Sequence, residues 1–272
     1  MQLSIASSVY LNYLIQDTIR YVAEAGYDGI DIWGGRPHVY RRDYSSGELQ
    51  QIHDLLEANH LRLVSFMPAF FRYPHSLSSP NEVVRQDSLE YMRLCLDNAV
   101  ALGAKTLLIV PSRSLHGQGV VEARKRLVDS IAVICRYAEP YDIRLALEHA
   151  NRMVTDLVNT ADDALGVIAE IGDDRLGVVL DSGHINLVDE PAREAVVKLG
   201  DRLLQVHVND NDGITQQNLV PGDGNFDFDE LIQVLKKVGY SGFLSAELGY
   251  QYTDDPNPAA QLTACRLREM SR

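Results

Sequence analysis

Residues 144–208 contain three short apolar runs, RLALE (144–148), LGVVLD (176–181) and LLQVHV (203–208), separated by segments with the apolar spacing of helices. One of these segments begins at Thr160, a residue type that caps helices, and runs to Ile171. Strands that alternate with helices pair in parallel through right-handed crossovers. This central stretch therefore predicts repeated β/α units.

The same alternation extends to both ends of the chain. Strands are expected at 3–6, 29–33, 61–66, 106–110, 144–148, 176–181, 203–208 and 242–247. Helices are expected at 14–25, 46–59, 81–102, 121–138, 160–171, 191–199, 228–238 and 258–270. Eight such units without a second compositional block predict one (β/α)8 TIM barrel over residues 1–272. A doubly wound sheet is the alternative, but no glycine-rich dinucleotide fingerprint follows the first strand.

Composition excludes several classes of protein. The chain carries 38 Asp and Glu against 25 Lys and Arg, a formal net charge of −13, which disfavours binding to nucleic acid. No apolar run approaches the roughly 18 residues of a membrane span. The segment Met1–Ile5 lacks the basic and apolar regions of a signal peptide, so we expect a cytoplasmic protein. Cys95, Cys135 and Cys265 are interpreted as reduced core residues.

Polar residues end the four late strands, and the active site of a TIM barrel lies at these strand ends. A single Glu there is usually a solvated rim residue, and an Asp before Ser-Gly is usually a turn or cap. Four adjacent strand ends, however, would converge on one point. Three carboxylates and one imidazole suit Mn²⁺, Mg²⁺ or Co²⁺, and Zn²⁺ is also compatible. We predict one divalent metal ion, Mn²⁺ before the others, held by Glu148, Asp181, His207 and Glu247.

The segments around these residues resemble the sugar isomerase and epimerase superfamily, which has a xylose-isomerase-like barrel. The resemblance covers essentially the whole chain, including the turn PGDG (221–224) before Phe226. The stretch YDGIDIWGGRPH (27–38) is most similar to the fructoselysine and ketose 3-epimerase branch. The strand ends that carry the resemblance are Leu147-Glu148, Leu180-Asp181-Ser182-Gly183-His184, Val206-His207-Val208 and Ala246-Glu247-Leu248.

The resemblance implies a metal-dependent isomerase or epimerase of a ketose or related sugar. In such enzymes the metal polarises the carbonyl group, and two carboxylates move the proton beside it on opposite faces of the substrate. By position these carboxylates are Glu148 and Glu247, while Asp181 and His207 serve as ligands only. His184 is expected to contact a substrate oxygen and stabilise the enediolate, with a structural, helix-capping role as its alternative.

Three positions depart from the ketose 3-epimerase pattern. Val154 and Gly213 stand where that branch has a glutamate and an arginine, and His149 stands where it has a proline. His149 is therefore a third catalytic candidate, as a base or proton shuttle, or else a structural residue. Because of these departures, a lyase is the alternative function, either an inosose dehydratase or the catalytic subunit of a C-glycoside deglycosidase. The latter acts on 3-oxo-glycosides with a small β-rich partner subunit.

Early loops supply further candidates for the pocket. Trp33, Arg36 and His38 are predicted to bind substrate. Four apolar residues after the third strand would form a wall, a lid or a subunit contact, namely Phe66, Met67, Phe70 and Phe71. The other histidines are interpreted as surface or loop residues, namely His53, His60, His75 and His116.

Other functions fit the sequence less well. The loops after strands seven and eight carry five aspartates, which would repel a phosphate group, so we expect an unphosphorylated sugar as the small-molecule partner. A DNA-repair enzyme of the same superfamily would need additional histidine ligands that strands three and four lack. A non-enzymatic barrel would leave four coincident strand-end ligands unexplained. We expect a homo-oligomer, or a hetero-oligomer with a small β-rich subunit if the lyase hypothesis holds.

Overall fold

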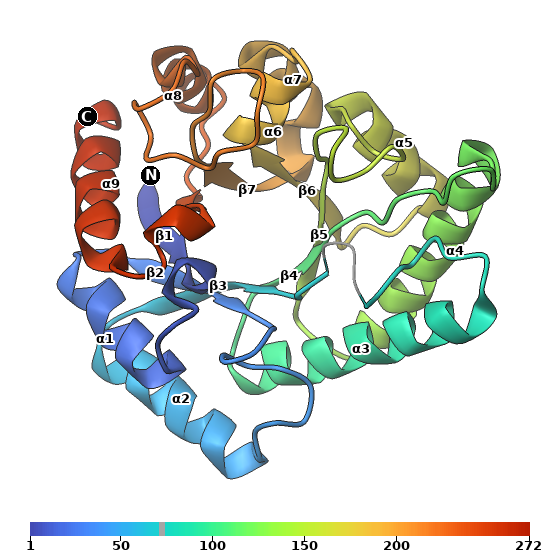
Figure 1. Cartoon of the computed structure of the whole chain (residues 1–272), viewed down its shortest axis with the longest axis horizontal. Helices are drawn as coiled ribbons and strands as arrows, with labels where there is room; N and C mark the ends of the chain where they lie inside the picture. Colours follow the sequence, from blue (N-terminus) through green and yellow to red (C-terminus); the bar gives the residue numbers. More distant parts are fainter. Residues whose placement is uncertain (71–73) are drawn as a thin grey trace.

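Eight parallel strands close into a barrel in the computed structural model, which describes residues 1–70 and 74–272 (Figure 1). Each strand pairs with its sequence neighbour, and the last pairs with the first. The predicted single (β/α)8 barrel is confirmed. The strands are β1 (Gln2–Ala6), β2 (Gly29–Trp33), β3 (Arg62–Met67), β4 (Thr106–Ile109), β5 (Arg144–Glu148), β6 (Leu176–Asp181), β7 (Leu203–Val208) and β8 (Phe243–Ala246).

Helices form the outer ring around the strands (Figure 1). The α-helices are α1 (Ile15–Glu24), α2 (Ser46–Ala58), α3 (Glu82–Ala101), α4 (Val120–Ala138), α5 (Ala161–Ile171), α6 (Ser182–Leu187), α7 (Ala192–Leu199), α8 (Phe228–Lys237) and α9 (Pro256–Met270). The described residues also form three 3-10 turns, η1 (Ser7–Tyr10), η2 (Gly200–Arg202) and η3 (Tyr250–Tyr252). Helix α6 was not expected from the sequence. None of the described helices is both long and apolar enough to cross a membrane.

Local signals explain where the helices begin and end. The Thr160 side chain accepts from the backbone N–H of Asp163, and the Asp163 carboxylate accepts in return from the N–H of Thr160. This capping box satisfies N–H groups that a helix leaves free at its start. Gly172 ends α5 with φ of 73°, a left-handed conformation that glycine adopts without a steric penalty.

The barrel separates two apolar clusters because alternate strand residues point to opposite sides. The large cluster fills the space between the outer strand faces and the helices. The small cluster lies inside the barrel and consists of Ala6, Met67, Leu108, Ala146 and Val179. Side chains therefore fill much of the interior, and the mouth of the barrel is where a substrate site is expected.

One sequence interpretation was wrong about burial. Cys265 is exposed on α9, whereas Cys95 and Cys135 are buried as expected. His75 lies in a loop, as interpreted, but it is buried there, and its ring stacks on Tyr91 with centroids 4.1 Å apart. Neither residue had a partner that could be recognised in the sequence. Phe71 lies outside the described residues.

Candidate metal centre

The four predicted ligands come together at the mouth of the barrel. Each offers one ligand atom, and these atoms lie within 4.8 Å of one another. Glu148 and Asp181 are the last residues of β5 and β6, His207 is the penultimate residue of β7, and Glu247 follows β8. Asp181 is in register with His207, and His207 with Ser245, so the twist of the barrel brings these strand ends to one point.

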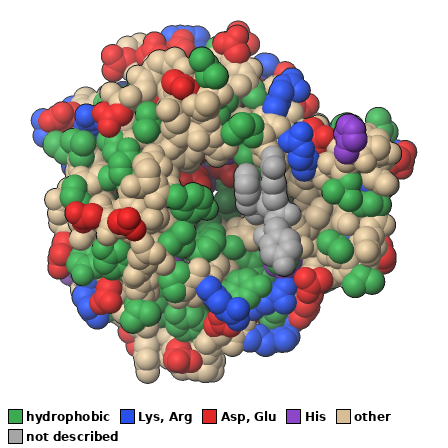
Figure 2. Space-filling model, in the orientation of Figure 1, with side chains coloured by type: hydrophobic (Ala, Val, Ile, Leu, Met, Phe, Trp, Pro, Cys, Tyr) green, Lys and Arg blue, Asp and Glu red, His purple; other side chains and the backbone are tan. Residues whose placement is uncertain are grey.

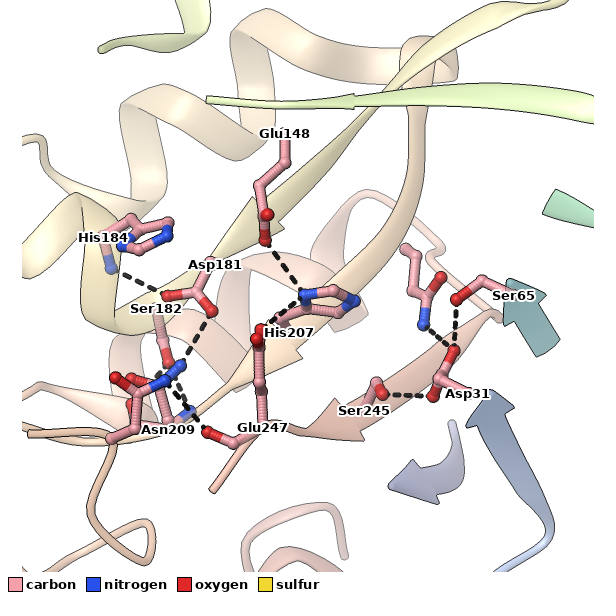
Figure 3. A network of polar contacts seen from close by, with 12 residues as sticks. Asp31, Ser65, Glu148, Asp181, Ser182, His184, His207, Asn209, Ser245 and Glu247 are labelled. Atoms are coloured by element: carbon pink, nitrogen blue, oxygen red, sulfur yellow. Dashed lines mark hydrogen bonds and ion pairs between the residues drawn. The ribbon is translucent and has the colours of Figure 1, made fainter. Parts of the chain in front are cut away.

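His207 is the centre of this group (Figure 3). Its Nδ1 lies 3.0 Å from Glu148 Oε1 and 3.0 Å from Glu247 Oε2. The imidazole and the Asp181 side chain are fully buried, Glu148 is nearly so, and Glu247 is half-buried. One imidazole nitrogen and three carboxylates therefore converge in a site that is largely shielded from water.

Asp181 is held by both of its carboxylate oxygens. Oδ1 accepts from the backbone N–H of His184 at 2.8 Å, which caps α6, and Oδ2 accepts from Asn209 Nδ2 at 2.7 Å. Asn209 was missed in the sequence, although it lies two residues beyond His207 and so follows the same alternation. Gly183 allows this approach, because a Cβ there would collide with the Asn209 side chain.

Burial and neighbouring charges shift the pKa values in this group. Burial raises the pKa of Asp181 to about 6, with His184 opposing the shift and Glu247 adding to it. Burial also acts to raise the pKa of Glu148, but the hydrogen bond and charge of His207 outweigh it and the pKa is lowered. Burial acts to lower the pKa of His207, yet Glu148 and Glu247 hold it well above its ordinary value.

This donor set fits a divalent cation. Three carboxylates facing one imidazole leave an excess of buried negative charge, and burying unpaired charge is costly. No lysine or arginine is among the described residues that line the adjacent pocket. A cation bound by Glu148, Asp181, His207 and Glu247 would neutralise that charge, and oxygen-rich sets with one imidazole suit Mn²⁺, Mg²⁺, Co²⁺ or Zn²⁺.

His184 faces the pocket beside these ligands and is fixed by Asn151. The Asn151 side-chain oxygen accepts from the N–H of Met153, so its Nδ2 is the atom that donates, 3.0 Å from His184 Nδ1. With Nδ1 as the acceptor, the neutral imidazole carries its proton on Nε2. His184 is therefore prepared to donate a hydrogen bond from Nε2.

The pocket above the metal group has a volume of about 550 Å³ and includes Glu148, His184 and Glu247 in its lining. Figure 2 shows the hollow, with acidic side chains at its floor and hydrophobic side chains beside it. One side is apolar and includes Trp33, Met67, Phe70, Leu108, Val110 and Val154. The other side carries amide groups from Gln216, Gln217, Asn218 and Gln251.

The predicted substrate-binding residues of the early loops lie in different places. Trp33 lines the pocket, as does His184 from the late half. Arg36 is exposed and forms a bidentate ion pair with Asp43. His38 is buried, with Nδ1 3.0 Å from the hydroxyl of Ser7. Neither Arg36 nor His38 is among the residues that line the pocket.

His149 also lies outside the pocket lining. Alternation along β5 turns its side chain away from the side on which Glu148 meets the metal group. Its imidazole is fully buried, and Nε2 lies 3.4 Å from the carboxylate of Glu190. Glu190 in turn accepts from the backbone N–H of Ala161 at the start of α5.

Two sequence motifs lie near the site. The buried carboxylate of Asp210 accepts from the backbone N–H groups of Gly222, Gly224 and Phe226, which holds the 221–224 turn in place. Val154 lines the pocket, so an apolar group stands where the resemblance would place a glutamate.

Comparisons with known proteins agree with this architecture. A family model described as a xylose isomerase-like TIM barrel matches residues 19–270. Fructoselysine 3-epimerase from Escherichia coli O157:H7 is 30% identical over 256 residues, which cover 94% of this chain and 93% of that protein.

Solved structures are similar over the whole chain. A D-tagatose 3-epimerase-like protein matches with a TM-score of 0.86 and 25% identity, over 99% of this chain and 97% of that chain. The IOLI protein with a bound zinc atom matches with a TM-score of 0.84 over 100% of this chain and 98% of that chain. Its identity is 21%, so this second likeness shows the fold alone.

Proposed function

The chain belongs to the xylose isomerase-like TIM barrel family, and from that membership and the geometry of the site we propose that it is a divalent-metal-dependent 3-epimerase or isomerase of a ketose or related sugar. The observation that carries the proposal is the convergence of Glu148, Asp181, His207 and Glu247 within 4.8 Å at the mouth of the barrel. Mn²⁺ is the proposed ion, and the zinc atom of the IOLI protein supports a metal in this fold.

Proton transfer is assigned to the two glutamates. A bound cation would polarise the ketose carbonyl group as a Lewis acid and so acidify the neighbouring C–H. Glu148 and Glu247 enter the pocket from two different strands, β5 and the end of β8, and their carboxylates meet at Nδ1 of His207 (Figure 3). One glutamate removes the proton from carbon, and the other returns one to the opposite face.

His184 and the apolar side of the pocket complete the proposed machinery. The Nε2–H of His184 donates to the oxygen on which negative charge develops when the proton leaves, which is worth most where water is excluded. Trp33, Met67 and Phe70 supply the apolar surface that excludes it. Asp181, held by Asn209 and the helix α6 N-terminus, serves only as a ligand.

The size and charge of the pocket indicate the class of sugar. A six-carbon ketose has on the order of twelve non-hydrogen atoms and fills at most about 360 Å³, even at the roughly 30 Å³ that a water molecule takes in the liquid. The cavity of about 550 Å³ therefore has room for a ketose with a substituent. The absence of lysine and arginine from its described lining favours an unphosphorylated one.

A lyase acting on a keto-sugar is a weaker candidate. That hypothesis gave His149 the task of assisting the leaving group, which requires the imidazole to reach the substrate. The buried contact of His149 with Glu190 and its absence from the pocket lining support a structural role instead. The homo-oligomer and the cytoplasmic location expected from the sequence stay predictions.

Mass spectrometry of the reaction in deuterated water tests the proposal. Purified protein loaded with Mn²⁺ is incubated with free ketoses, fructoselysine, an inosose and a 3-oxo-glycoside. We expect a product that is the epimer of its ketose substrate and carries one deuterium at the inverted carbon. A metal-free sample treated with chelator is the control and should incorporate no deuterium.

Two results would overturn the proposal. Loss of water, or cleavage of the 3-oxo-glycoside into two products without deuterium entering any ketose, would identify a lyase. Unchanged isotope incorporation in the chelated sample would remove the metal from the mechanism.

A further inference from the structure

A second polar group lies inside the barrel, on β2, β3, β7 and β8. The buried carboxylate of Asp31 on β2 accepts from Ser65 Oγ at 2.6 Å, from Gln205 Nε2 at 2.7 Å and from Ser245 Oγ. Each of these residues is at most 1% exposed. Figure 3 shows Asp31, Ser65 and Ser245 on the side of His207 that faces away from Glu148 and His184. Burying a carboxylate is costly, so three hydrogen bonds that stabilise one inside the barrel suggest that it has a function there.

Asp31 fixes the orientation of the Gln205 amide. A carboxylate only accepts hydrogen bonds, so the NH₂ end of Gln205 must face it. The carbonyl oxygen Oε1 is then turned the other way. Oε1 is buried and has no hydrogen-bond partner among the described residues, which leaves an acceptor free inside the barrel.

His207 presents the complementary donor. Because its Nδ1 faces Glu148 and Glu247, the proton of the neutral ring lies on Nε2 when Nδ1 binds a metal. Nε2 is buried without a partner among the described residues. His207 and Gln205 are two residues apart on β7, so both side chains point into the barrel. Histidines that bind metals almost always donate their other N–H to an acceptor.

A buried water molecule between these two groups would satisfy both. Ser4 Oγ is a third buried polar atom without a described partner. Ser4 is two residues before Ala6, which belongs to the cluster inside the barrel, and it is in register with Ser245. A water molecule that accepts from His207 and donates to Gln205 and Ser4 would have the usual three or so partners of internal water.

We propose that Asp31 is a positioning residue for the metal centre. Asp31 holds the NH₂ group of Gln205, so the Gln205 carbonyl oxygen is available to a buried water molecule. That water accepts the hydrogen bond from His207 Nε2–H. The ring proton therefore stays on Nε2, and Nδ1 remains free for the cation. The inference rests on the proposed metal-dependent function and extends it to residues that touch neither metal nor substrate. Outer partners of this kind are commonly worth about 10–100-fold in metal affinity.

Variants of the two residues test the inference by isothermal titration of the metal-free protein with Mn²⁺. Gln205→Met keeps the length of the side chain but removes the acceptor, and Asp31→Leu releases the amide. Each should raise the Kd for Mn²⁺ by about 10–100-fold. The double variant should bind Mn²⁺ with the same Kd as the single variant that binds it less tightly, because both changes break the same connection.

Two matched controls separate positioning from general damage to the barrel. Asp31→Asn can still accept from Gln205 while its NH₂ group donates to Ser245, so it should keep the Kd of the wild type. Ser65→Ala removes a hydrogen bond to the same carboxylate oxygen but leaves Gln205 in place, and it should change the Kd by less than about threefold.

A second readout does not depend on affinity or on turnover. In Zn²⁺-loaded protein with ¹⁵N-labelled histidine, the Nε2–H proton of His207 should give a slowly exchanging NMR signal. Gln205→Met should abolish or shift that signal, and this holds even if Asp31→Leu does not fold.

A wild-type Kd together with an unchanged Nε2–H signal in Gln205→Met would overturn the inference while leaving the metal site intact. A wild-type protein that binds no Mn²⁺ would instead overturn the proposed function.

Discussion

The two halves of the barrel mouth have different chemistry. The late strands β5 to β8 deliver Glu148, Asp181, His207 and Glu247 to one point. The early half surrounds the same pocket with Trp33, Met67, Phe70, Leu108 and Val110. The reactive groups thus come from the late half, whereas the early half contributes mainly apolar surface that shapes the space and excludes water.

This division teaches that reaction and substrate selection are separable in the molecule. Changes in the late half should alter metal binding and the rate of the chemical step. Changes in the early half should alter substrate affinity or stability while the metal stays bound.

The largest effect is expected from Asp181→Ala. The change removes a ligand and leaves Asn209 Nδ2 without its acceptor, so bound Mn²⁺ should fall below detection and turnover should fall by more than about 10³-fold. Metal content is measured by plasma mass spectrometry after gel filtration. The matched control is Asp229→Ala, an exposed carboxylate on α8, which should keep full metal content. Full occupancy in Asp181→Ala would break the assignment of the late half.

His184→Ala should separate metal binding from catalysis within the late half. The backbone N–H that bonds to Asp181 remains, so the metal should stay bound. The donor from Nε2 is lost, and kcat should fall by about 10²–10³-fold with a smaller change in KM, because the bond is made mainly to the developing charge. Steady-state kinetics and metal analysis are run side by side, with His116→Ala as the control. Loss of the metal would reassign His184 as a ligand.

The sequence could predict the late half because two general rules meet there. Alternation within each strand and the location of TIM-barrel sites at strand ends together pointed to the four ligands. The same alternation, applied to His149 after Glu148, turns its side chain to the other side of β5, where it lies near Glu190. A chain that turns at a strand end leaves this undecided in the sequence.

Features made by contacts between distant segments could not be predicted in this way. Asp31 sits in the apolar run GIDIW, and its partners lie 34, 174 and 214 residues away. Asn151 became visible only through its contact with His184. Helix α6 has six residues, which is too short for its apolar spacing to be recognised.

An intermediate effect on stability is expected from His38 in the early half. Burial lowers its pKa from 6.5 to about 4. The unfolded chain therefore binds more protons between about pH 6.5 and pH 4, and folding stability falls as the pH falls through that window. From pH 7 to pH 5 this histidine should contribute a loss of about 2 kcal/mol.

The His38→Asn variant isolates that contribution. The Asn amide can still bond with the Ser7 hydroxyl but does not titrate. Between pH 7 and pH 5, the free energy of unfolding should therefore fall about 2 kcal/mol less in the variant than in the wild type. Urea unfolding at the two pH values gives both differences, and exposed His116→Asn should retain the wild-type dependence. Identical pH dependence in His38→Asn and wild type would show that another group causes the acid sensitivity.

The smallest effect is expected from Val110→Ala on the apolar side of the pocket. Val110 is half-buried just after β4 and lines the cavity away from the metal group. Loss of the contacts of two methyl groups should weaken the binding of the substrate and of the transition state equally, by about 1 kcal/mol, because these contacts do not depend on charge. KM should therefore rise about fivefold while kcat and metal content stay at wild-type values. Val121→Ala, an exposed position on α4, should change neither constant. A fall in kcat at unchanged KM would mean that the early half also takes part in the chemical step, and the separation between the two halves would fail.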